Sequence, residues 1–384
     1  MHLGRARLLQ RVLAPLIVLL AASRVPGASA DAPSAARAPF PDRHWDAVTA
    51  ADAGLAGAGL ATDPASSLYG NPALGLEGPR SFRASGLLSQ PNRDDLRSST
   101  TDFSDASGFF ALGEAGARLR WKGVGVTAYF AQPHYEHQET RFVGIDPGTG
   151  MVTGDPFVRL NRFTSATRYA GLSAAVRLPN GLLVGAGGEA VFLTERYEST
   201  PQVPPATPGA DSFAVDRKAT AIGGAVGAAY TARGLVTVGA SYHRAGRVTP
   251  SGGGQDEPPA FALVGVKVGR SAGSQGYAGA RFLGARDADL GEAGGSPHAA
   301  KARQEFAVGY AYLSPGGSWD FRIGGGFSPR PDAGAIKRSR FGAAFGMGNE
   351  GARVGLAFAH TGENRASGRP SSRNLLVATV ELVR

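Results

Sequence analysis

The histidines are the residues of this sequence best suited to chemistry, and they lack the neighbours that a reaction centre needs. His134 and His137 flank Glu136, and imidazole and carboxylate groups are common metal ligands. The three residues fall in a predicted surface loop, however, and a metal site needs ligands that converge from a fixed scaffold. His243 and His360 are candidates for the Ser/His pairs of membrane-barrel hydrolases, but neither has a sequence neighbour that acts as an orienting acid.

A glycine-rich stretch near the N-terminus suggests phosphate binding, but its spacing argues against it. Gly54, Gly57 and Gly59 form neither GxGxxG nor GxxxxGK[ST], and no β-α-β pattern follows them. The sequence has no cysteine, which excludes disulfides and thiolate metal sites. We therefore predict a protein that is not an enzyme and holds no cofactor and no metal. An outer-membrane enzyme that depends on a Ser or a His remains a third alternative.

The N-terminus predicts export. Four arginines stand in the first thirty residues, which contain no acid, and they contribute to the formal net charge of +9. The apolar run 12–22 is too short to span a bilayer, and Ala28-Ser29-Ala30 supplies a small-residue cleavage pattern. Residues 1–30 are therefore predicted to be a signal peptide, with an N-terminal anchor helix as the alternative. The remaining positive charge is small and scattered, which argues against a nucleic-acid partner.

From about residue 80 the sequence alternates with a period of two, the pattern of strands that have one apolar face. In residues 319–328, the apolar side chains of Trp319, Phe321, Ile323 and Phe327 share one face. The opposite faces of such segments are rich in Gly and Ala, with scattered Arg, Glu, Thr and Ser. Small inward-facing residues leave room inside a closed sheet for water, a plug or a ligand.

Loop lengths and aromatic positions distinguish a membrane barrel from a soluble sandwich. Aromatic residues stand near the ends of the segments, and short turns alternate with longer polar loops, as in outer-membrane barrels. In hydrocarbon an unpaired backbone group costs several kcal/mol, so the sheet must close on itself. We therefore predict an all-β fold, a transmembrane antiparallel β-barrel of about 14 strands. The predicted strands are 79–88, 114–121, 124–133, 165–177, 181–196, 217–231, 234–246, 259–269, 275–285, 302–313, 317–328, 336–347, 351–361 and 373–383. The predicted longer loops are 89–113, 134–164, 197–216, 247–258, 286–301, 329–335 and 362–372.

Residues 51–78, ADAGLAGAGLATDPASSLYGNPALGLEG, carry a motif that precedes the barrel. A Gly/Ala-rich run is followed by an Asp, a run of small residues, an aromatic residue and Asn-Pro-Ala. This order resembles the N-terminal segment of the outer-membrane long-chain fatty acid transporter (FadL) family, which also has fourteen strands. The resemblance implies a small hatch inside the barrel, and the residues carried over to it are Gly57, Gly59, Asp63, Tyr69, Asn71, Pro72 and Ala73.

The resemblance also implies a domain organisation and a route. Residues 31–78 form the hatch segment and residues 79–384 the barrel in the bacterial outer membrane. The family releases its ligand sideways near the third strand, so Phe130, Gln132 and Pro133 are our candidates for a lateral opening. Pro133 cannot donate a ladder hydrogen bond, which weakens pairing there; the alternative is that Pro133 merely ends the strand.

We therefore expect an outer-membrane channel for passive uptake of hydrophobic small molecules such as long-chain fatty acids. Its expected partners are outer-membrane lipid and the hydrophobic ligand. The alternative is a non-transporting barrel with a structural or secretion-associated role, which would have a protein partner. The pocket-lining residues of the family have no counterparts that can be matched in this sequence, so the ligand is not specified.

Overall fold

The computed structural model describes most of the chain after residue 46. The described residues are 47–91, 96–98, 101–103, 109–143, 158–201, 213–246, 255–256, 260–270, 272–284, 286–289, 298–300, 303–328, 337–364 and 370–384. The predicted signal peptide and residues 31–46 of the predicted hatch segment lie outside the described residues.

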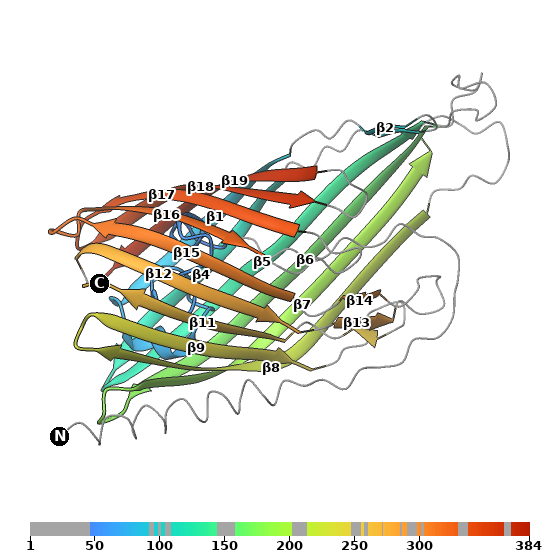
Figure 1. The fold of residues 1–384 in the computed structure, drawn as a ribbon. Helices are drawn as coiled ribbons and strands as arrows, with labels where there is room; N and C mark the ends of the chain where they lie inside the picture. Colours follow the sequence, from blue (N-terminus) through green and yellow to red (C-terminus); the bar gives the residue numbers. More distant parts are fainter. Residues whose placement is uncertain are drawn as a thin grey trace.

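Fourteen antiparallel strands close into one barrel, as the sequence predicts (Figure 1). Each strand pairs with its neighbours in chain order, and the first strand pairs with the last, from Ser81 opposite Val383 to Pro91 opposite Arg373. Two small sheets, β2-β3 and β10-β13-β14, are separate from the barrel. The barrel strands are β1 (Ser81–Pro91), β4 (Phe109–Trp121), β5 (Val124–Val143), β6 (Val158–Arg177), β7 (Leu183–Pro201), β8 (Phe213–Ala232), β9 (Val236–Ala245), β11 (Phe261–Val268), β12 (Gly273–Leu283), β15 (Arg303–Leu313), β16 (Trp319–Phe327), β17 (Lys337–Gly348), β18 (Ala352–Asn364) and β19 (Pro370–Val383). The short strands are β2 (Leu96–Ser98), β3 (Thr101–Phe103), β10 (Gln255–Asp256), β13 (Arg286–Asp289) and β14 (His298–Ala300).

The two ends of the barrel differ, and we call them the turn end and the loop end. Short turns join the strands at the turn end, where the C-terminus also lies (Figure 1). The turn between β4 and β5 has only two residues, Lys122 and Gly123, both with positive φ. Positive φ at both central residues is the requirement of the two-residue hairpin turns that match strand twist.

At the loop end several strands are longer than predicted. β5 runs to Val143 and β6 begins at Val158, so the predicted loop 134–164 was wrong at both of its ends. Similarly, β7 runs to Pro201 and β8 begins at Phe213. These extensions are rich in polar and charged residues, so their apolar alternation is too weak to identify them as strands.

Alternation within each strand separates an apolar outer face from a small and polar inner face. On β16, Trp319, Phe321 and Phe327 are exposed on the outside, while Asp320 and Arg322 are buried on the inside. The outer face is therefore suited to lipid, as predicted. Among the described residues, no helix is long and apolar enough to cross a membrane.

Residues 47–80 lie before β1 and include a short helix, α2 (Ala50–Gly54), and a 3-10 helix, η1 (Pro72–Leu76). Strand glycines approach this segment all around the barrel. A Cβ on Gly324 of β16 would lie 2.5 Å from the carbonyl carbon of Leu55, and one on Gly185 of β7 would lie 2.5 Å from that of Pro72. Residues 47–78, which we call the luminal segment, therefore lie inside the barrel, in blue in Figure 1.

Candidate functional site

The inner wall toward the loop end carries an apolar cluster. Tyr69 of the luminal segment forms its floor, stacking on Tyr169 at a centroid distance of 6.2 Å and contacting the edge of Phe261. Aliphatic side chains from several strands surround these rings. The buried members of this apolar cluster are Val48, Leu60, Ala61, Leu68, Tyr69, Tyr129, Ala131, Tyr169, Val191, Leu193, Ala221, Ala245, Phe261, Leu263 and Leu283.

The inner wall toward the turn end is charged. A cavity of about 580 Å³ lies there between the luminal segment and the strands. Its charged lining comes from both, and comprises Asp63, Glu77, Arg83, Arg118, Lys267, Asp320, Arg322, Arg353 and Glu381. The luminal segment thus lies between the apolar cluster and this charged cavity.

The Asn-Pro-Ala residues of the predicted hatch motif fasten the luminal segment to the wall. Asn71 caps η1 because its Oδ1 accepts a hydrogen bond of 3.0 Å from the Ala73 amide, and Pro72 occupies the first helical turn, where no amide is needed. The Nδ2 of Asn71 donates to Ala61 O at 2.9 Å and to Ala228 O of β8 at 3.2 Å. One amide side chain therefore joins two parts of the segment to the barrel.

Asp63 forms a buried ion pair with the wall. Its Oδ2 contacts Arg322 Nη1, and Arg322 Nε contacts Asp320 Oδ2 at 2.7 Å. Burial raises the pKa of the Asp63 carboxyl, but Arg322 and Lys267 outweigh burial and hold that pKa below its ordinary value. Asp63 is therefore ionised and holds the segment by charge.

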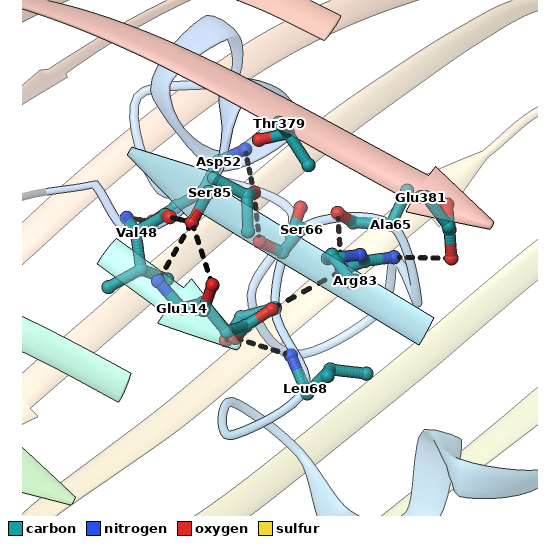
Figure 2. Close-up of polar contacts among 12 residues, drawn as sticks. Val48, Asp52, Ala65, Ser66, Leu68, Arg83, Ser85, Glu114, Thr379 and Glu381 are labelled. Atoms are coloured by element: carbon teal, nitrogen blue, oxygen red, sulfur yellow. Dashed lines mark hydrogen bonds and ion pairs between the residues drawn. The ribbon is translucent and has the colours of Figure 1, made fainter. Parts of the chain in front are cut away.

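A second charged contact joins the segment to the strands on either side of the barrel closure (Figure 2). Glu114 of β4 accepts hydrogen bonds from Ser67 Oγ at 2.5 Å and from the Leu68 amide at 2.7 Å. Arg83 of β1 lies between Glu114, at 3.5 Å, and Glu381 of β19, at 3.1 Å. Because these groups are nearly fully buried, removal of one partner leaves the others without compensation.

Asp52 of α2 is the segment's least compensated acid. Its Oδ2 accepts a hydrogen bond of 3.2 Å from the Val48 amide, whereas Oδ1 has no hydrogen-bond partner among the described residues. Burial raises the pKa of the Asp52 carboxyl to about 6. The luminal segment thus contains one acid that titrates near neutral pH.

His243, a candidate catalytic residue in the sequence, contacts a barrel carboxylate, a backbone carbonyl of the luminal segment and an aromatic ring. Its Nδ1 lies 2.9 Å from Glu189 Oε1, its Nε2 lies 3.0 Å from Gly70 O, and its ring stacks on Phe261. Ser241 Oγ donates to the same Gly70 carbonyl at 2.6 Å rather than to the histidine. The histidine therefore binds the luminal segment and does not activate this serine.

The other chemical candidates also lie on strands or turns. His134 pairs with Thr167 and His137 with Thr164, so both belong to the β5–β6 ladder and not to a loop. Residues 269–273, GRSAG, match the letters of the GxSxG hydrolase motif. Gly269 follows β11 and Gly273 begins β12, however, so a strand comes next, whereas the nucleophile motif requires a strand followed by a helix.

A small basic cavity lies on the loop-end side of the luminal segment. Arg281 of β12 contacts Glu305 of β15 at 2.6 Å, and Arg340 of β17 reaches the same carboxylate at 3.4 Å. These residues and Arg338 line a cavity of about 20 Å³ beside Leu60. Two guanidinium groups thus share one carboxylate, and a third lines the same space, which is large enough for about one water molecule.

The candidate lateral residues lie where the barrel wall is interrupted. β4 and β5 pair from Trp121 opposite Val124 only as far as Glu114 opposite Ala131. Just beyond, Gln132 and Pro133 form an irregularity in the β5–β6 register. β5 continues past Pro133 to Val143, so the alternative that Pro133 merely ends the strand was wrong.

A groove of about 690 Å³ crosses the outer face beside this interruption. Its floor is made of small residues from four neighbouring strands, and Phe82 and Leu382 stand at its edge. Phe130, the remaining lateral candidate, follows Tyr129 of the groove on β5. The small residues of the groove are Ala84, Ala115, Gly116, Ala117, Ala128, Ala170 and Gly171.

Solved structures share this architecture. No protein-family model and no curated protein matches the sequence. A FadL homologue of Pseudomonas aeruginosa superposes with a TM-score of 0.59 at 13% identity, covering 90% of this chain and 99% of that one. The chain has the fold of the FadL homologues. The toluene transporter TbuX of Ralstonia pickettii gives a TM-score of 0.61 at 18% identity, covering 88% and 98%. The toluene transporter TodX of Pseudomonas putida gives 0.57 at 13%, covering 89% and 99%. These neighbours with the FadL fold are channels rather than enzymes, and the fold fits an outer-membrane location.

Proposed function

We propose that the protein is an outer-membrane channel for passive uptake of hydrophobic small molecules, with residues 31–78 as its hatch. One observation carries the proposal: the luminal segment has an apolar cluster on its loop-end side, beside the basic cavity, and a large charged cavity on its turn-end side. Burial against the apolar cluster lowers the free energy of an apolar molecule by about 25 cal/mol per Å² of buried surface. Contact with the charged cavity raises its free energy, because charged groups there must be desolvated. A straight path through the barrel is therefore unfavourable for such a ligand.

The sideways path is favourable for the same ligand. The β4–β5 pairing ends beside the apolar cluster residue Ala131, and the outer groove of small residues begins at the same strands. We propose that ligand enters at the extracellular loop end, passes Phe130, Gln132 and Pro133, and reaches lipid along the groove. The TodX and TbuX structures are described as those of toluene transporters, which supports a hydrophobic ligand here.

We further propose that the ligand carries a carboxylate, as a long-chain fatty acid does. Arg281, Arg338 and Arg340 line the basic cavity against one acid, Glu305. Guanidinium groups bind carboxylates in charge-assisted, frequently bidentate hydrogen bonds. Because the cavity of about 20 Å³ is closed to a ligand headgroup, binding requires the luminal segment to shift near Leu60.

Filling the groove tests the route. Ala84→Trp combined with Ala128→Trp should slow uptake of a labelled long-chain fatty acid into cells at least tenfold, without reducing binding to the purified barrel. Ala186→Trp, at an exposed position on β7 away from the groove, is the matched control and should transport normally. Uptake that is unchanged in the groove variant would exclude the lateral route.

The headgroup is tested separately. Arg340→Gln should weaken binding of palmitate about tenfold and leave binding of hexadecanol unchanged, because only the acid offers a charge to the guanidinium group. If the purified barrel binds neither compound saturably, transport itself is excluded. The alternative of a non-transporting barrel is supported by the luminal segment inside the barrel, and it predicts copurification with a protein partner instead.

A further inference from the structure

Four cationic side chains lie on the outer face of four consecutive strands, toward the loop end. They are Arg168 of β6, Arg196 of β7, Lys218 of β8 and Arg244 of β9, and we call them the basic rim. All four fall on the same alternation as outward-facing neighbours, such as Leu172 on β6. The side chains of Arg196 and Lys218 are 60% and 67% exposed.

The basic rim stands at the upper boundary of the apolar outer surface. On β8, the outward positions run from Tyr230 near the turn end through Val226 and Ile222, all exposed, to Lys218. At about 3.3 Å per residue and a tilt of about 40°, the twelve residues from Tyr230 to Lys218 rise about 30 Å. The apolar band of a bacterial barrel is about 25 Å tall, so Lys218 reaches the headgroup layer of the outer leaflet.

Aromatic side chains mark the same boundary on the neighbouring strands. Phe192 of β7 is directly opposite Arg168 in the β6–β7 register. Tyr242 precedes Arg244 by two residues on β9, and therefore shares its face. An aromatic residue followed by a cation is the order expected where hydrocarbon gives way to charged headgroups.

The distribution around the barrel is one-sided. At the loop-end boundary, the outward side chains that the structure describes on the other strands are neutral, such as Phe110, Phe282, Phe327, Phe341 and Asn374. Within the part of the chain whose side chains the structure describes, outward Lys and Arg at or above this boundary occur on β6 to β9 alone. A cluster of outward cations on four consecutive strands is the pattern expected of a local anionic ligand.

Nearby acids pair with two of the four cations of the rim. Arg196 pairs with Glu198, and Lys218 pairs with Asp216 at 3.0 Å. Arg168 instead donates to two neutral groups, Gln132 Oε1 at 2.8 Å and Thr194 Oγ1 at 3.4 Å. Both acids follow their cations toward the loop end, which places positive charge closest to the membrane.

We propose that the basic rim binds the phosphate groups of an outer-leaflet glycolipid of the lipid A type. The outward apolar residues Leu172, Phe192 and Ile222 below the rim offer contact to acyl chains, and guanidinium and ammonium groups above them offer hydrogen bonds to phosphate oxygens. Charge complementarity thus selects an anionic headgroup over a zwitterionic one. The proposal does not depend on transport, because all four residues face outward.

Native mass spectrometry of the intact barrel tests this proposal, with diphosphoryl lipid A and enzymatically dephosphorylated lipid A as probes. Wild type should retain the diphosphoryl form preferentially, and 0.5 M NaCl should weaken retention through screening. The variant Arg168→Gln/Arg196→Gln/Lys218→Gln/Arg244→Gln should lose at least tenfold in affinity, since a basic residue at a charged membrane surface is worth about fivefold.

The matched control removes four exposed charges from the turn end, as Arg80→Gln/Lys122→Gln/Arg233→Gln/Arg270→Gln, and should bind lipid A like wild type. Electrophoretic mobility without heating reports that each barrel is folded. Equal retention of both probes by wild type would overturn the proposal, and this result needs no variant. Equal losses in the rim and control variants would overturn it too, because total charge rather than the rim would then control binding.

Discussion

The contact between Gly324 and Leu55 predicts how firmly the luminal segment is held. Alanine at Gly324 would place its Cβ 2.5 Å from Leu55 C and 2.6 Å from Leu55 O, both backbone atoms. Ordinary van der Waals contact begins at about 3.4 Å, so the segment or β16 must move by nearly 1 Å. Overpacking of this kind costs about 1–3 kcal/mol. Gly324 is paired with strands on both sides of β16, whereas the Leu55 backbone bonds only within the segment, so we expect the segment to move.

The assay uses the absence of cysteine from the chain. A single Ala56→Cys substitution places a thiol next to Leu55, at a position that is 9% exposed and lines the basic cavity. A membrane-impermeant maleimide then labels only molecules whose segment has opened. A loss of 1–3 kcal/mol raises the open population, and hence the labelling rate, by about 5- to 150-fold.

Gly325→Ala provides the control on the same strand. Its Cβ would face outward, with Arg340 O at 3.7 Å, which is an ordinary contact. It should label at the wild-type rate, although both variants change β-propensity equally. The reasoning is refuted if Gly324→Ala labels no faster than Gly325→Ala. It is also refuted if Gly324→Ala loses the folded barrel, because the wall would then yield before the segment.

Three further predictions concern buried charges of the luminal segment. Burial raises the pKa of Asp52 from 3.8 to about 6, so between these pH values the folded protein holds a proton that the unfolded chain has released. The free energy of unfolding therefore falls by about 3 kcal/mol as pH rises through this window. Asp52→Asn should abolish that pH dependence, measured by urea unfolding in the presence of vesicles. Arg322→Met should cost about 3–5 kcal/mol in the same assay by leaving Asp63 unpaired, and adding Asp63→Asn should recover part of the loss. Glu114→Gln should cost about 1–3 kcal/mol and accelerate cysteine labelling of the segment, whereas equal labelling rates would show that its charge is not needed there.

The sequence predicted the barrel because lipid imposes a rule on every second residue. In β16, Trp319, Phe321 and Phe327 alternate with Asp320 and Arg322. The residues of this segment alone therefore identify it as a strand and distinguish its outer face from its inner face. All fourteen barrel strands were predicted for this reason. The extensions of strands such as β5 were missed because above the membrane neither face needs to be apolar.

The candidate site was less accessible to sequence reasoning, because its contacts join distant strands. Glu189 and His243 are 54 residues apart, and only the closed barrel brings them together. The same holds for Asp63 and Arg322. One signal was present: a charged residue at an inward position among Gly and Ala must find a partner inside. Which partner it finds depends on the strand register and the path of the luminal segment.

The pairing of the first strand with the last has a consequence for biogenesis. Ser81 meets Val383 across about three hundred residues, so the wall cannot seal until the end of the chain is in place. Contacts this distant in sequence form late, because the entropy of closing the intervening chain must be overcome first. Residues 47–78 precede β1 and lie inside the finished wall, so they must enter while it is still open. We therefore expect the barrel strands to close around residues 47–78 during assembly, with these residues inside before β1 pairs with β19.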